Sequence, residues 1–180
     1  STAIEMRDRA LMAFVILTGA RDGAVASAKI KHIDLVEQSF YQDARDVNTK
    51  FSKTFTTYFF PVGELPLRIL TEWIDYLTQD LGFKQNSPLF PKTKLAHNAN
   101  QQFEAVGLLG EHWSNANPIR KAFAQAFEAA GLPYFNPHSF RNTLVRLGER
   151  LCQTPEEFKA WSQNLGHESV LTSFYSYGDV

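Results

Sequence analysis

HSFRNTLVRLGER, residues 138–150, predicts a helix that places two polar side chains where it begins. Asn136 precedes it and can cap its free backbone N–H groups. His138 then lies in the first turn, a position that attracts anions because those N–H groups lack helical partners. Arg141 comes three residues later on the same face, so its guanidinium can fork two hydrogen bonds to a phosphate. The pair predicts a phosphate site, although a solvated histidine and arginine would give the same pattern.

Outward from this helix, hydrophobic periodicity and capping residues predict a mainly helical chain. Residues 33–62 instead carry β-branched and aromatic residues without a helical period, which predicts two or three antiparallel strands. Residues 83–116 show no clear pattern, and we interpret them as turns and loops, an insertion or a mobile segment. The fold class is mainly α with a small antiparallel β-sheet (α+β), in one domain over residues 1–180. Helices are expected over residues 3–18, 22–30, 65–82, 118–130 and 137–152, between Thr154 and Gly166, and from about 169.

Composition limits the class of protein. The chain has 180 residues, 44% of them hydrophobic, which is enough for a substantial core. No apolar run has the length of a membrane span, no signal peptide is evident, and the single cysteine, Cys152, fits a reducing, cytoplasmic compartment. The net charge of -1 is unusual for a DNA-binding protein, but residues 117–152 hold five basic residues and two acidic ones. Basic charge is therefore expected to concentrate on one face.

Further polar residues stand beside the ends of predicted elements. TGARDG (residues 18–23) places Arg21 just after a helix-ending glycine, and LGHES (residues 165–169) places His167 in the same way. TKFSKT (residues 49–54) places two lysines in a predicted β-turn, and SFYSYGDV ends the chain with two tyrosines. Taken singly, each motif is better explained by solvated turn residues or core aromatics than by a functional site.

Taken in order, these motifs resemble the catalytic domain of the tyrosine recombinases, the phage-integrase family. TGARDGAVASAKIKHIDL (residues 18–35) is similar to the family's first arginine box, and KTFTTYFFPV (residues 53–62) to its β-hairpin lysine. PHSFRNT (residues 137–143) resembles its H-x-L-R-H-T box, and LGHESVLTSFYSY (residues 165–177) its ending. The resemblance covers about residues 10–180 and implies a DNA strand-exchange enzyme.

The resemblance assigns a role to each basic side chain of the predicted phosphate site. Arg21 and Arg141 would clamp the non-bridging oxygens of the scissile phosphate and stabilise the charge of the transition state. His138 would assist proton transfer, and His167 would hydrogen-bond the phosphate. Asn142 stands where the family commonly has a histidine.

The sequence offers two candidates for the catalytic lysine and two for the nucleophilic tyrosine. The resemblance implies a lysine that acts as general acid toward the leaving 5′-hydroxyl. Lys53 matches it best, because it stands eight residues before the strand-ending proline, and Lys50 is the alternative. Tyr177 would be the nucleophile that forms a 3′-phosphotyrosyl link, and Tyr175 is the alternative. The family's usual tyrosine position, nine residues after the last histidine, is Ser176 here.

The resemblance implies no nucleotide cofactor, because the phosphotyrosyl link conserves the energy of the broken bond. It also implies no metal. The expected partners are double-stranded DNA and further recombinase protomers in a tetrameric synapse. No association with a membrane is expected. A phage or another mobile element of a bacterium is the expected source. The family's N-terminal DNA-binding domains have no counterpart in residues 1–180, so we expect a catalytic domain alone. The alternative functions are a type IB topoisomerase-like nicking-closing enzyme and a non-catalytic helical DNA-binding domain.

Overall fold

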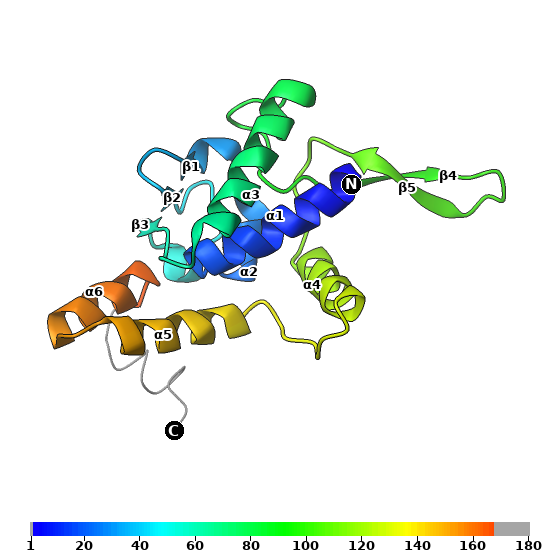
Figure 1. Cartoon of the computed structure of the whole chain (residues 1–180). Coiled ribbons are helices and arrows are strands. Elements are labelled where there is room, and N and C mark those ends of the chain that lie inside the picture. The colour runs from blue at the N-terminus through cyan, green and yellow to red at the C-terminus, as the bar shows by residue number, and fades with distance from the viewer. Residues whose placement is uncertain (1, 168–180) are drawn as a thin grey trace.

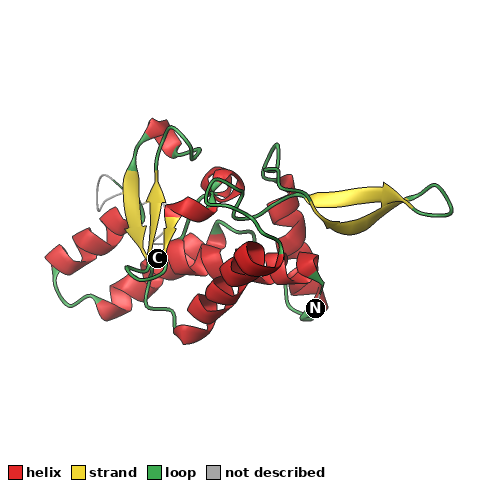
Figure 2. Ribbon diagram, turned by 90° about the horizontal axis from the view of Figure 1, so that it is seen from above, coloured by secondary structure: helices red, strands yellow, loops and turns green. Residues whose placement is uncertain are grey.

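The computed structural model describes residues 2–167; the helix expected from about residue 169, Tyr175 and Tyr177 lie outside the described residues. The described part is mainly helical with small antiparallel sheets, as the sequence predicts (Figures 1 and 2). Within it, no helix combines the length and the hydropathy that crossing a bilayer requires.

Helices and strands are interspersed up to residue 108, and three helices follow between residues 117 and 164. The helices are α1 (Ala3–Thr18), α2 (Asp22–Ser27), α3 (Glu64–Asp75), α4 (Asn117–Ala129), α5 (Ser139–Leu151) and α6 (Pro155–Asn164). Two short 3-10 helices, η1 (Ile30–His32) and η2 (Lys50–Ser52), lie between them, and a π-helix, η3 (Tyr76–Asp80), continues α3. Strands β1 (Ile33–Asp34), β2 (Ser39–Gln42) and β3 (Phe55–Tyr58) form one antiparallel sheet in that order, and β4 (Thr93–His97) pairs with β5 (Phe103–Leu108) in a separate hairpin.

Helix α1 forms the centre of the larger hydrophobic core. Leu11, Phe14 and Val15 are fully buried, and the ring of Phe14 meets Phe40 of β2 edge-on, 5.0 Å between centroids. Helix α3 packs along α1, while α4 and α5 also contact it. The helix ends at Gly19, which has a left-handed φ of 59° that glycine adopts at little cost. Arg21 follows this turn two residues later.

Several helix boundaries differ from the sequence prediction, and backbone or side-chain contacts explain two of the differences. The helix predicted over residues 22–30 ends at Ser27, because the backbone of Ala28 accepts a hydrogen bond from Leu89 N and Ile30 N donates to Ser87 O. This non-local pairing draws the chain out of the helix. Asn117 is the first residue of α4 rather than its cap, and its N–H donates to the side chain of Asn115.

The β4–β5 hairpin was not predicted from the sequence. It projects away from the helical body at the end opposite the three-stranded sheet (Figures 1 and 2). Most of its residues are exposed on both faces, so its strands lack the alternation of apolar and polar residues that marks a half-buried strand. Buried Arg7 of α1 holds its base: Nη1 donates to Pro91 O at 3.0 Å and to Thr93 Oγ1 at 2.9 Å.

Helices α5 and α6 pack on each other around a second, smaller cluster of apolar side chains, which lies beside the sheet. The Thr154 hydroxyl accepts from Glu157 N and the Glu157 carboxylate accepts from Thr154 N, which confirms the predicted capping box. The indole of Trp161 donates to Leu144 O at 2.9 Å, which fixes α6 against α5. The members of the cluster are Phe60, Leu144, Val145, Phe158 and Leu165.

Gly148 allows this close packing of α5 and α6. A Cβ atom at this position would lie 2.6 Å from the indole nitrogen of Trp161. We therefore expect Gly148→Ala to lower the free energy of unfolding by about 1–3 kcal/mol, because overpacking outweighs the gain of about 1 kcal/mol that alanine normally gives a helix. Chemical denaturation measures the change, and Gly110→Ala is the control, since only a Phe83 ring carbon at 4.0 Å lies near it. Equal stability of the two variants would contradict the prediction.

Candidate phosphate-binding site

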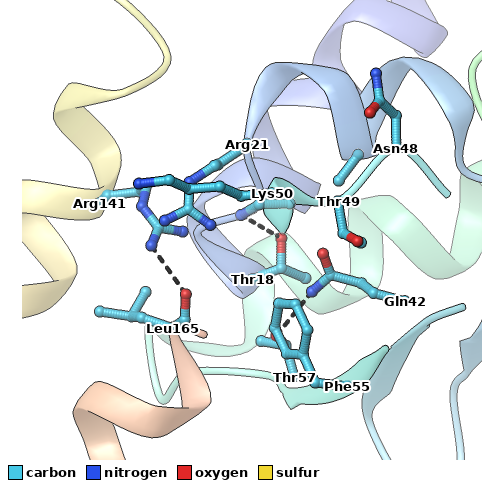
Figure 3. A pocket seen from close by; sticks show the side chains of 12 residues that line it. Thr18, Arg21, Gln42, Asn48, Thr49, Lys50, Phe55, Thr57, Arg141 and Leu165 are labelled. Atoms are coloured by element: carbon cyan, nitrogen blue, oxygen red, sulfur yellow. Dashed lines mark hydrogen bonds between the residues drawn. The ribbon is translucent and has the colours of Figure 1, made fainter. Parts of the chain in front are cut away.

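Arg141 forms the centre of the candidate site. Its side chain is only 2% exposed, and its guanidinium joins three segments that are distant in sequence. Nη1 donates to Gly19 O at the end of α1, and Nη2 donates to Leu165 O after α6 at 2.8 Å (Figure 3). Nη2 also lies 3.0 Å from Nε2 of His167. The guanidinium is thus held in place by protein groups.

Gly19 has a second role here, because the chain approaches the Arg141 region closely at this turn. A Cβ atom on Gly19 would lie 2.7 Å from Leu165 Cδ2 and 2.9 Å from Leu144 Cδ1. The absence of a side chain lets the Gly19 carbonyl reach Arg141 beneath α5. The glycine that ends α1 therefore positions both predicted arginines, one through its carbonyl and one through the turn.

His167 is buried beside Arg141 and carries no charge near neutral pH. Burial lowers the pKa of His167 to about 4, and the positive charges of Arg141, Arg21 and Lys50 act in the same direction. Because arginine only donates hydrogen bonds, Nε2 must accept, which leaves the proton on Nδ1. Nδ1 lies 3.4 Å from the hydroxyl of Ser162 on α6.

The lowered pKa of His167 predicts a dependence of stability on pH. The folded protein binds the proton less tightly than the unfolded chain, whose pKa is near 6.5, so stability is complete above pH 6.5 and falls as pH drops toward 4. We expect the unaltered protein to lose about 2 kcal/mol between pH 7.5 and pH 5 through this group. The lowered pKa values of His32 and His138 act in the same direction.

His167→Gln should reduce the loss of stability between pH 7.5 and pH 5, whatever its effect on stability at pH 7.5. Urea denaturation at the two pH values measures it, and His97→Gln is the control, since His97 lies on the projecting hairpin. If His167→Gln retained the full slope, a neutral His167 in the folded protein would be ruled out.

Arg21 stands at the start of α2 and reaches the same region as Arg141. Both side chains line a small pocket whose floor is made of polar residues of α1 and of the sheet (Figure 3). The hydroxyl of Thr18 in this floor accepts from Ala20 N at 3.1 Å, which shapes the turn that carries Arg21. The polar residues of the floor are Thr18, Gln42 and Thr57.

The two lysines lie in the connection between β2 and β3, residues 43–54. Lys50 lines the pocket that contains Arg21 and Arg141. Both Lys50 and Lys53 line a neighbouring pocket together with Arg21 and His167. Phe51, between them, has a left-handed φ of 58°, which is unusual for a residue with a side chain. The structure therefore brings both lysines to the site and leaves the choice between them open.

His138 lies at the edge of the site, on the turn before α5. The Asn136 side chain accepts from Ser139 N at 3.1 Å, so Asn136 caps this turn as the sequence predicts, although α5 itself begins at Ser139. Partial burial lowers the pKa of His138, and the positive charges of Arg141 and Arg21 lower it further. His138 therefore shares the electrostatic environment of the two arginines.

The structure thus brings together the two predicted arginines, the two predicted histidines and both candidate lysines. Tyr175 and Tyr177 lie outside the described residues, so the structure does not place them. Sequence reasoning missed Gln42 and Thr57 in the pocket floor, which no local motif marks. Among residues 2–167, no group of three or more His, Cys, Asp or Glu side chains has the arrangement of a metal site.

Comparison with known proteins gives a family and a fold. The family model described as "Phage integrase family" matches residues 1–179. Among solved structures, the fold is similar to the crystal structure of XerA recombinase, with a TM-score of 0.65 and 21% sequence identity. That match covers 97% of this chain and 52% of the recombinase, so this chain spans about half the length of that protein. No curated protein sequence matches the chain significantly.

Proposed function

The chain belongs to the phage integrase family, and on that premise we propose that it is the catalytic domain of a site-specific DNA recombinase. One observation carries the proposal. Arg21, Arg141 and His167 come from three distant parts of the chain and line adjoining pockets beside the lysine connection. Two arginines, a hydrogen-bonding histidine and nearby lysines gathered in this way suit a single phosphate of double-stranded DNA.

The arginines would bind the two non-bridging oxygens of the scissile phosphate. Gly19 O and Leu165 O hold the guanidinium of Arg141, so little reorganisation of the guanidinium is needed as charge develops in the transition state. A bound phosphate favours a protonated imidazole. Protonation would turn Nε2 of His167 from an acceptor for Arg141 into a donor to the phosphate.

The chemical step needs a nucleophile and a proton donor. The phenolate oxygen of Tyr177, with Tyr175 as the alternative, would attack phosphorus as the bond to the 5′ oxygen breaks. Lys53, with Lys50 as the alternative, would give a proton to that oxygen, while His138 assists proton transfer. The resulting 3′-phosphotyrosyl link retains the bond energy, so a second 5′-hydroxyl can reverse the step and rejoin the strands.

Recombination needs more than one active site, so the proposal includes further protomers on DNA, as a tetrameric synapse. Strand exchange by the proposed chemistry requires neither a metal nor an organic cofactor. A cytoplasmic location in a bacterial host of a phage or mobile element would give the protein access to DNA.

Covalent capture on DNA tests the proposal. The probe is a pool of duplexes with a randomised central segment and a nick, so that the short strand released by cleavage diffuses away and traps the adduct. We expect a protein–DNA adduct that resists detergent and is lost after proteolysis. No adduct from any duplex in the pool would overturn the proposed enzyme and leave a non-catalytic DNA-binding domain. Relaxation of supercoiled DNA without strand exchange would favour the topoisomerase-like alternative.

A further inference from the structure

Asp46 lies in the same connection as the two lysines and binds three basic residues of another segment. Its Oδ1 accepts from Lys29 Nζ at 2.7 Å, and its Oδ2 lies 2.6 Å from Lys31 Nζ. The buried His32 ring brings Nε2 to 3.5 Å from the same Oδ2, while its Nδ1 accepts from Lys29 N. Lys29 and Lys31 hold the pKa of Asp46 well below its usual range, so the carboxylate is ionised near neutral pH.

These contacts join the lysine connection to the segment that follows Arg21. Lys29, Lys31 and His32 lie just beyond α2, the helix that Arg21 precedes. Next to Asp46, the Val47 side chain is buried in the core, and Asn48 N donates to Ser27 Oγ at 2.8 Å. Residues 46–48 are therefore fixed on α2 and the turn after it.

Beyond residue 48 the connection is far less enclosed. Phe51 is 85% exposed, and both Phe51 and Ser52 have left-handed backbone angles. Asp46 does not line the two pockets that contain Arg21, whereas Lys50 and Lys53 of the same connection line one of them. The connection is thus fixed at residues 46–48, and its two lysines lie on the exposed part that follows.

We propose that Asp46 is a positioning residue, which anchors the lysine connection on Lys29, Lys31 and His32 so that a lysine reaches the leaving 5′ oxygen. This inference rests on the proposed recombinase chemistry. Without the anchor, the phosphate clamp of Arg21 and Arg141 is still in place. Only the transfer of a proton to the leaving oxygen is impaired.

Asp46→Asn removes the charge and keeps the shape of the side chain. We expect it to slow cleavage by roughly 10-fold to 100-fold, since small displacements of a catalytic group and the loss of general acid assistance cost this much or more. Asp46→Glu, which keeps a carboxylate, should recover part of the rate. Asp75→Asn, an exposed change on α3, is the matched control and should cleave as the unaltered protein does.

A second substrate separates proton donation from folding and binding. In this nicked duplex, selected from the randomised pool, sulfur replaces the 5′ oxygen at the cleavage site. The tyrosine oxygen bonds to phosphorus, the phosphorus–sulfur bond breaks, and a thiolate leaves with the electron pair. A thiol has a pKa near 8.5, far below that of an alcohol, so this group leaves without a proton. We expect Asp46→Asn and the unaltered protein to cleave the sulfur substrate at similar rates.

The cleavage rates of these variants on the two substrates distinguish a positioning role from a structural one. Asp46→Asn cleaving the oxygen substrate at the unaltered rate would overturn the inference alone, and equal slowing on both substrates would show a structural role instead. Lys31→Gln removes one of the partners of Asp46. It should slow cleavage of the oxygen substrate less than Asp46→Asn does, and it should cleave the sulfur substrate at the unaltered rate. This variant tests the inference even if Asp46→Asn does not fold. If the unaltered protein forms no adduct, the proposed function fails and this inference fails with it.

Discussion

Arg141→Lys is expected to lower the rate of DNA cleavage by on the order of 10²-fold to 10³-fold, the cost of losing one preorganised donor to a transition-state charge. Lysine keeps the positive charge but cannot reproduce the planar fork. One ammonium group cannot serve Gly19 O and Leu165 O and also present a second donor to a phosphate. The effect is therefore expected on the chemical step, measured as the single-turnover rate of adduct formation on the nicked duplex.

Arg146→Lys is the matched control, because Arg146 lies on the same helix but is exposed. Its cleavage rate should be within about twofold of that of the unaltered protein, as expected of a surface substitution. The stability of both variants is compared by urea denaturation, since Arg141 also ties α1 and α6 to α5. If folded Arg141→Lys cleaved DNA as fast as Arg146→Lys, Arg141 would have no part in the chemistry.

Tyr177→Phe is expected to abolish the covalent adduct entirely while DNA binding persists. Phenylalanine keeps the ring and removes only the oxygen that would attack phosphorus, and no other group replaces it. Tyr175→Phe should retain the adduct. Adduct formation on the nicked duplex and a gel-shift assay measure the two properties separately.

The two tyrosine variants also decide between the alternatives that the sequence leaves open. Loss of the adduct in Tyr175→Phe and its retention in Tyr177→Phe would reverse the assignment. Retention in both would contradict tyrosine catalysis at this end of the chain. Mass spectrometry of the digested adduct identifies the modified residue independently.

Local signals in the sequence predicted much of this fold. Thr154 with Glu157 marked the start of α6, and Gly19 marked the end of α1, because capping depends on residues only a few positions apart. The β4–β5 hairpin escaped prediction, because its strands are solvated on both faces and carry no alternation. The true end of α2 depends on pairing with residues 87–89, which no local pattern reveals.

The candidate site was predicted as a set of residue types, but its geometry was not. Arg21, Arg141 and His167 could be found because each follows a helix start or stop signal. The burial of Arg141 between Gly19 O and Leu165 O depends on packing between α1, α5 and α6, over 122 and 24 residues of separation. Asp46 was missed for the same reason, since its partners lie on another segment and share no motif with it.

A structure of the Tyr177→Phe variant bound to an uncleaved duplex selected from the pool would show whether Arg21 and Arg141 hold a DNA phosphate between them. We expect one backbone phosphate within hydrogen-bond distance of both Arg21 and Arg141, with the ammonium group of Lys53 or Lys50 beside its 5′ oxygen. DNA bound with no phosphate between the two arginines, and with its backbone on another face of the protein, would contradict it.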